Sequence, residues 1–154
     1  MDNISAYPFE LLWRLILAIV AGAAIGLNRM MYHKPAGIGT HALVALGGAL
    51  AASIALHMPG GDVAAASRVM QGLVTGVGFI GAGVIMRESQ SDQVHGLTTA
   101  ASIWTCTVIG IACAMCNIQT SATALILALI VLIGSKPLER ALEKHFQHGE
   151  QDRS

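Results

Sequence analysis

The sequence predicts an all-α membrane protein with five transmembrane helices. Of its 154 residues, 54% are hydrophobic and only 12% are charged, and the mean hydropathy is +0.62. Soluble domains carry about 25% charged residues, so roughly half the usual charge is missing. The uncharged residues gather in long runs, each of a length that crosses a bilayer. The net charge is zero and no basic face is present, which argues against nucleic-acid binding.

The first expected span covers residues 9–27. It begins directly after Pro8, a residue suited to the first turn of a helix. The early charges are Asp2 and Glu10, so the N-terminus lacks the positive region of a signal peptide, and we expect a retained span. Arg14 lies about one turn inside the run and can snorkel toward the interface.

The other four expected spans follow along the chain, and a turn at Pro59 to Gly61 separates the second from the third. Only a few residues separate the last two, which should therefore be antiparallel neighbours. The four spans cover residues 41–57, 68–86, 97–115 and 118–133. The transmembrane domain then occupies residues 1–134.

Residues 135–154 are expected to form a short cytoplasmic tail. Pro137 can begin a separate helix there, with Leu138, Leu142 and Phe146 recurring on one face. Such a helix could lie along the membrane surface or pack on the cytoplasmic loops. The alternative is a solvated extension.

The positions of lysine and arginine predict the orientation. Two of these nine residues, Arg14 and Arg68, fall on one side of the predicted membrane, and the other seven fall on the opposite side: Arg29, Lys34, Arg87, Lys136, Arg140, Lys144 and Arg153. The positive-inside rule therefore predicts that the N-terminus is outside and the C-terminus cytoplasmic.

Small residues are densest in residues 68–102, so we expect this stretch to be the centre of the bundle. Glycines at such density let helix backbones approach closely in a membrane. The candidate packing glycines are Gly22 and Gly26 in the first span and Gly72, Gly76, Gly78, Gly81 and Gly83 in the third. The spacing of Gly76, Gly78 and Gly81 also matches a dinucleotide-binding pattern, but the preceding strand and the later acidic residue are missing.

Polar residues inside the spans are the first functional candidates, because they are costly in a bilayer. Arg68, Gln71 and Thr75 share one face of the third span. Thr98 and Ser102 belong to a similar spacing in the fourth span. The alternative is that these groups only join helices, and Ser or Thr can satisfy itself on its own helix.

Three further candidates, Arg29, Lys34 and His41, lie at the predicted cytoplasmic ends of spans. They could line a mouth that binds an anion or a protein, or they could be ordinary interfacial anchors.

The acidic residues that ion chemistry needs are missing from most of the spans. None occurs between Leu11 and Leu56, and none lies within the third, fourth or fifth span. Magnesium prefers oxygen ligands, and a proton-coupled transporter usually keeps an intramembrane acid. No nucleophile, base and orienting residue lie together, so we expect no enzyme, no cofactor and no metal site. The cysteines, Cys106, Cys113 and Cys116, are interpreted as small apolar fillers, although the last two form a C-x-x-C pair.

Several motifs resemble the MgtC/SapB family. The first is Gly26-Leu27-Asn28-Arg29, followed by Lys34-Pro35-Ala36-Gly37-Ile38-Gly39-Thr40-His41. The second runs from Arg68 through Gln71-Gly72 and Thr75-Gly76-Val77-Gly78-Phe79-Ile80-Gly81-Ala82-Gly83-Val84-Ile85. The third is Gly96-Leu97-Thr98-Thr99-Ala100-Ala101, with Trp104 after it, which adds Thr99 to the candidates. The resemblance covers about residues 11–133.

The resemblance implies a multi-pass protein of the bacterial inner membrane, linked to magnesium homeostasis, virulence and intracellular survival. It implies a non-enzymatic modulator that acts through the bilayer and membrane partners, including ATP synthase, and a homo-oligomer is an option. The alternatives are a small ion or solute transporter or channel, and a purely structural assembly subunit.

The chain departs from the family pattern in three places. Asn28 stands where the family typically has an acidic residue, and Ile38-Gly39 stands where Leu-Arg is common. If those charges form a network, it is altered here. We also expect no cytoplasmic ACT-like domain after the last span.

Overall fold

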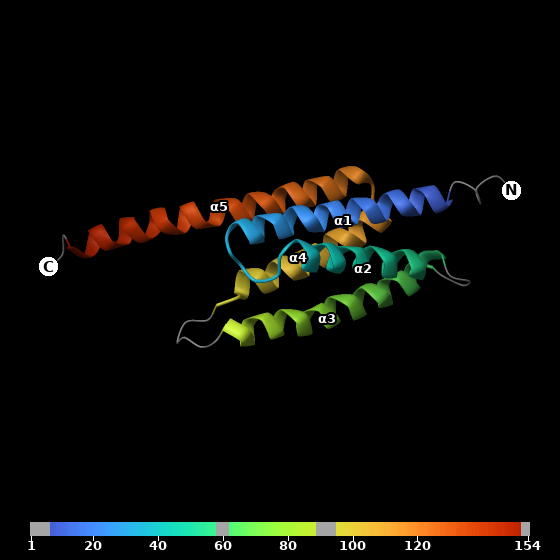
Figure 1. Ribbon diagram of the computed structural model, residues 1–154, viewed down its shortest axis with the longest axis horizontal. Helices are drawn as coiled ribbons and strands as arrows, with labels where there is room; N and C mark the ends of the chain where they lie inside the picture. Colours follow the sequence, from blue (N-terminus) through green and yellow to red (C-terminus); the bar gives the residue numbers. More distant parts are fainter. Residues whose placement is uncertain (1–6, 58–61, 89–94, 152–154) are drawn as a thin grey trace.

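The computed structural model describes residues 7–57, 62–88 and 95–151, and these residues form helices joined by short connections (Figure 1). The elements are α1 (Tyr7–Met31), α2 (Ile38–His57), α3 (Val63–Glu88), α4 (Leu97–Met115) and α5 (Ile118–Gln151). Each is long and apolar enough to cross a membrane. The predicted all-α class with five spans is confirmed, and the orientation of the termini stays a prediction.

The helix bounds extend the expected spans outward. Only α4 has the expected residues at both ends, while α1 and α3 run two to five residues farther at each end and α2 begins three residues earlier. The expected bounds followed the apolar runs, whereas helical hydrogen bonding continues into the polar flanks. The predicted turn at residues 59–61 lies outside the described residues.

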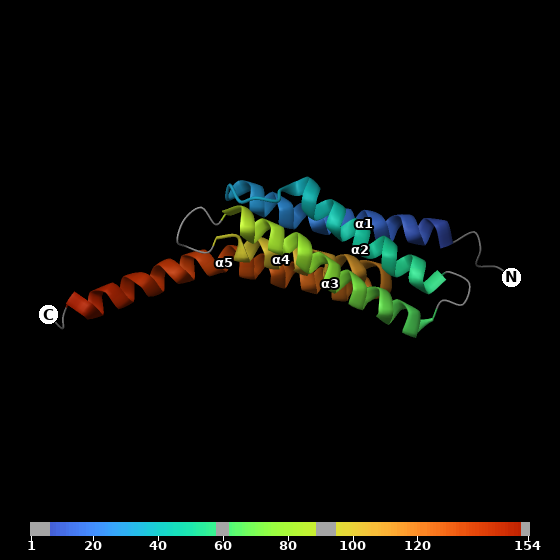
Figure 2. The same cartoon turned by 90° about the horizontal axis from the view of Figure 1, so that it is seen from below.

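The tail is helical as far as Gln151, but its helix does not begin at Pro137. α5 is continuous over 34 residues and includes Pro137 in its interior. Proline removes one backbone hydrogen bond and commonly bends a helix without ending it, and Figure 2 shows α5 curving away from the bundle. At 1.5 Å per residue the helix is about 51 Å long, more than a hydrocarbon core of about 30 Å. Its C-terminal part therefore extends beyond the spanning region, and the side chains of Leu138, Leu142 and Phe146 lie outside the described residues.

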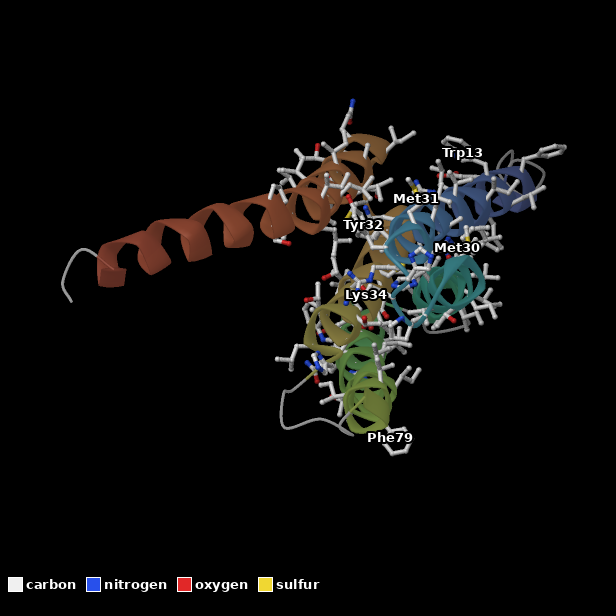
Figure 3. The ribbon with its side chains drawn as sticks, turned by 60° about the vertical axis from the view of Figure 1, so that its left-hand side comes forward. Trp13, Met30, Met31, Tyr32, Lys34 and Phe79 are labelled. Atoms are coloured by element: carbon white, nitrogen blue, oxygen red, sulfur yellow. The ribbon has the colours of Figure 1, made fainter. Side chains whose placement is uncertain are left out.

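α4 is the centre of the bundle. It packs against all four other helices, and 56% of its spanning window is buried, against 11% for α3 and for α5. The expectation that residues 68–102 form the centre is thus correct for the start of α4 and wrong for α3. α3 lies on the outer side of α2 and α4 (Figures 1 and 2). Phe79 is 85% exposed and points away from the other helices in Figure 3.

Glycines bring α1 against α2. A Cβ added to Gly26 would lie 2.5 Å from the Cα of Ile38, and one added to Gly22 would lie 2.8 Å from the Cα of Ala42. No real Cβ sits that close to backbone, so both positions require the absence of a side chain. The two helix backbones can therefore pack as closely as small residues allow in membrane proteins.

Two glycines that the sequence analysis did not single out join α2 to α4. A Cβ on Gly48 would lie 2.7 Å from the carbonyl oxygen of Thr107, and one on Gly110 would lie 2.8 Å from the carbonyl carbon of Ala45. The core between these helices is made of small side chains, with Ala45, Ala49 and Cys106 fully buried.

Within this chain, only one of the five α3 glycines lies against another helix, and packing of the others stays a prediction. A Cβ at Gly81 would lie 3.3 Å from the Cβ of Ala100 on α4. The other four, Gly72, Gly76, Gly78 and Gly83, have nothing within 4 Å of an added Cβ in this chain. The reason is that α3 has neighbours on one side only.

Hydrogen bonds in the connections cap the ends of several helices. α1 closes with the amide of Lys34 bonded to the carbonyl of Arg29 and that of His33 bonded to the carbonyl of Met30, each at 3.0 Å. His33 has a φ of 51°, so this is a Schellman ending with histidine in the left-handed position. At the helix starts, Asp62 caps α3 and Asn117 caps α5 through their side-chain oxygens. The α1 ending turns the chain so that the start of α2 lies beside the last turns of α1.

Candidate functional site

A buried polar cluster lies where the end of α1 meets the starts of α2 and α4. Its members are buried residues of three different helices: Asn28, Arg29, His41, Thr99 and Ser102. We call these five residues the buried polar cluster. By the predicted orientation, this end of the bundle is cytoplasmic.

Arg29 is the charged member of the cluster and is only 3% exposed. Its Nη2 donates a hydrogen bond of 2.6 Å to the hydroxyl oxygen of Thr99, which is itself buried. This bond ties the last turn of α1 to the first turn of α4. The neighbouring Asn28 is 8% exposed, and its side-chain oxygen has no hydrogen-bond partner among the described residues.

His41 is fully buried and joins α2 to α4. Its Nδ1 lies 3.0 Å from the carbonyl oxygen of Gly37, and because a carbonyl only accepts, Nδ1 carries the donated proton. Its Nε2 pairs at 3.0 Å with the hydroxyl of Ser102, and the single proton of that hydroxyl is donated either to Nε2 or to the carbonyl of Thr99, which lies at 2.7 Å. One turn farther along α4, the Cys106 thiol donates to the backbone carbonyl of His41 at 3.2 Å.

The structure thus brings together three of the predicted candidates, Arg29, His41 and Thr99. Asn28 was noticed only as a departure from a family pattern, and Ser102 only as a helix-spacing partner of Thr98. Lys34 and Thr98 lie at the same end but are exposed, and Figure 3 shows Lys34 in the α1–α2 connection. Thr98 lines a cavity of about 310 Å³ between α4 and α5. The side chain of Arg87 lies outside the described part.

The three candidates on α3 do not join the cluster. Arg68, Gln71 and Thr75 are exposed on the outer helix. The Thr75 hydroxyl donates to the carbonyl of Gln71 at 2.8 Å, which is the self-satisfaction expected of threonine. Among the described contacts, no hydrogen bond joins Arg68 to Gln71, so a function for this face stays a prediction.

The described side chains include few groups that could bind a metal ion together. They contain no group of three or more His, Cys, Asp or Glu residues placed to hold one. The buried polar cluster supplies a guanidinium, an imidazole, an amide and two hydroxyls. Its chemistry suits the joining of helices and the recognition of an acceptor or anion more than the binding of a divalent cation.

Arg14 forms a second polar joint at the opposite end of the bundle. Its Nη1 donates to the backbone carbonyls of Cys113, Ala114 and Cys116 at 3.0–3.2 Å, and its other nitrogens bond Glu10. The guanidinium thus satisfies the free carbonyls at the end of α4 and clamps α1 to α4. The sequence indicated only a snorkelling side chain, because the partner carbonyls are about 100 residues away.

Replacing Arg14 by methionine is expected to destabilise the bundle. The change removes hydrogen bonds from a charged donor, each worth about 1.5–3 kcal/mol, while the exposed pair with Glu10 adds little. We expect the melting temperature in detergent to fall by roughly 5–10 °C. Arg68→Met is the matched control, because Arg68 is an exposed arginine near the same end of the bundle. Equal melting temperatures for the two variants would contradict the clamp.

Comparison with known proteins gives a consistent result. The model of the MgtC family matches residues 15–141. The chain is 40% identical over 140 residues to Protein SrpB of Synechococcus elongatus, covering 83% of this chain and 76% of that protein. It is 39% identical over 132 residues to the "Putative magnesium transporter YhiD" of Escherichia coli K12, covering 80% and 59%.

A further relative is Protein MgtC of Salmonella typhimurium, 37% identical over 128 residues, covering 83% of this chain and 52% of that protein. The chain therefore spans between about half and three fifths of the length of YhiD and MgtC. No solved structure matches the chain.

Proposed function

Because the chain belongs to the MgtC family, we propose that it is a non-enzymatic membrane modulator of magnesium, ion or energy homeostasis. In this proposal it lies in the bacterial inner membrane and acts by binding other membrane proteins. ATP synthase is the partner that the family resemblance suggests.

The observation that carries this proposal is the character of the buried polar residues. In the described part of the chain they are Asn28, Arg29, His41, Ser53, Thr99, Ser102, Thr107 and Ser121, and none of them is an acid. A pathway for Mg²⁺ needs oxygen ligands that offset the cost of dehydration, and carboxylates do this best. A buried guanidinium repels a divalent cation at short range. The donor set therefore supports a role other than magnesium conduction.

The exposed helix faces support action through partners. α1, α2 and α4 pack closely through glycines and form the inner part of the bundle. α3 and α5 lie at its margin, and only 11% of each spanning window is buried. These faces are open to lipid and to the helices of another membrane protein, and Gly72 and Gly76 on α3 allow a close approach.

The second candidate is a small ion or solute transporter. It is favoured by the printed name of YhiD, which calls that protein a putative magnesium transporter. It is also favoured by the ionisable residues Arg29 and His41 inside the bundle, since intramembrane ionisable groups often mark a transport path.

Flux measurements in liposomes separate the two candidates. Purified protein is reconstituted and tested for movement of Mg²⁺, K⁺, protons and phosphate, with protein-free liposomes as the blank and an ionophore for each cation as the positive control. The modulator proposal expects flux equal to the blank for every solute. Selective and saturable flux of any of them contradicts it and supports the transporter.

A further inference from the structure

A small cavity lies at the end of the bundle where α4 joins α5. It has a volume of about 200 Å³, and it is lined by residues of α1, the end of α4 and the start of α5: Trp13, Arg14, Leu17, Cys113, Cys116, Ile118 and Ser121. Both cysteines of the C-x-x-C pair therefore face the same space. All three cysteines of the chain are free thiols.

The two cysteines differ in exposure in a way that suits thiol–disulfide exchange. Cys116 is exposed at the end of the helix, whereas Cys113 is 4% exposed one turn earlier. An accessible sulfur can be reached by a partner, and a protected sulfur beside it can resolve the intermediate. The interpretation of Cys116 as an apolar filler does not hold, because a filler is covered by other side chains.

The backbone keeps the two cysteines about one helical turn apart. The amide of Cys116 still bonds the carbonyl of Ala112 at 2.8 Å, so the helical turn persists as far as that nitrogen. Residues three apart in a helix have Cβ atoms about 5–6 Å apart, and a disulfide needs about 3.5–4.5 Å. Closing the bond therefore requires the Cβ atoms to approach by roughly 1–2 Å. Cys116 is the C-cap of α4 and has non-helical backbone, with φ −101° and ψ 176°, so the turn can adjust at this residue. The cavity gives both side chains room to turn.

The cavity also contains a buried polar side chain beside the thiols. Ser121 is 5% exposed, lines the same cavity and interacts through its hydroxyl with the thiol of Cys113. A polar, partly empty space around two thiols differs from the environment of Cys106, which is fully buried in the core and donates to the carbonyl of His41. Cys106 thus represents a structural cysteine of this chain and serves as a comparison.

We propose that Cys113 and Cys116 form a redox-active pair that is oxidised to a disulfide by exchange with the disulfide of a partner thiol oxidoreductase. The Cys116 thiolate attacks the partner disulfide, a mixed disulfide forms, and one partner thiolate leaves. The Cys113 thiolate then attacks the sulfur of Cys116, and the second partner thiolate leaves. The pair loses two electrons and two protons, and the partner gains both as a dithiol.

The position of the pair agrees with this chemistry. The predicted orientation places this end of the bundle outside the cytoplasm, where disulfides form and persist. The new bond closes the turn whose carbonyls bind Arg14, since the carbonyls of both cysteines are acceptors of that guanidinium. Oxidation therefore acts directly on the joint between α1 and α4.

The test is the thiol state of the protein in cells. Cells that produce a Cys106→Ala chain are quenched in acid, the protein is denatured, and free thiols are alkylated with a maleimide polymer before or after reduction. We expect the chain to carry no maleimide polymer when it is alkylated before reduction and two polymers when it is alkylated after reduction. The intact mass of the chain before reduction should be lower than that of the reduced chain by two hydrogen atoms.

Two single variants complete the experiment. In the Cys106→Ala background, Cys113→Ala leaves only the exposed Cys116, which should be recovered as a free thiol or in a mixed disulfide that reductant releases. Cys116→Ala should leave Cys113 as a free thiol. Two alkylated thiols in the parent chain without reduction overturn the proposal, whatever the activity of the protein.

Discussion

Replacing Gly110 by leucine is expected to remove most of the protein from the membrane fraction. A Cβ at Gly110 would lie 2.8 Å from the carbonyl carbon of Ala45 and 2.9 Å from its Cα. These are backbone atoms, so no side chain can rotate away and α2 must move off α4. Overpacking of a core costs about 1–3 kcal/mol even where side chains can shift, and more is expected where the backbone must move.

The matched control is Gly76→Leu on α3. Both changes place leucine at a glycine inside a spanning helix, but an added Cβ at Gly76 meets nothing within 4 Å in this chain. We expect its abundance to equal that of the parent, as measured by immunoblotting of membranes, while Gly110→Leu falls several-fold. A fall for Gly76→Leu alone would contradict the packing described above. Equal falls would show that a partner or a second copy covers the α3 face.

The helices were predictable because membrane insertion is a local property of the sequence. A run of apolar residues long enough for the bilayer is sufficient to indicate a span, and all five were found in this way. The arrangement of the helices was harder to predict, because glycine is at least as abundant where α3 faces outward as where α1 and α4 face neighbours. The spacing of glycines along a helix indicates that another helix can pack closely there, but it does not indicate which helix does so.

The buried polar cluster was only partly predictable for a related reason. Arg29 and His41 were candidates because each lies at a helix end with the expected orientation. Their contacts cross from α1 and α2 to α4, over 70 residues for Arg29 to Thr99 and 61 for His41 to Ser102. Nothing in a local pattern specifies such pairs. The contact of Arg14 with α4 could not be predicted either. Its acceptors are backbone carbonyls, which every residue has, so the identity of the residues does not indicate them.

Arg29→Met is expected to insert normally but to lose both stability and function. Methionine keeps the length and apolar character of the stem, so insertion is not impaired. The change removes the 2.6 Å bond that the guanidinium donates to the buried hydroxyl of Thr99. A hydrogen bond from a charged donor is worth about 1.5–3 kcal/mol, which corresponds to a fall of roughly 5–10 °C in melting temperature. Under the proposed function, the variant should also fail to support growth at limiting magnesium.

A double-mutant cycle shows whether the loss arises from this contact. Thr99→Val removes the acceptor with little change of shape, and the double variant should lose less than the sum of the two single variants, by about 1.5–3 kcal/mol. Lys34→Met is the matched control, because Lys34 is an exposed basic residue at the same end of the bundle, and its melting temperature should not change. Arg29→Lys keeps the charge without the planar fork, so it should recover only part of the stability. Strict additivity of Arg29→Met and Thr99→Val would mean that the two side chains act separately, and the joint between α1 and α4 would then have to depend on other contacts.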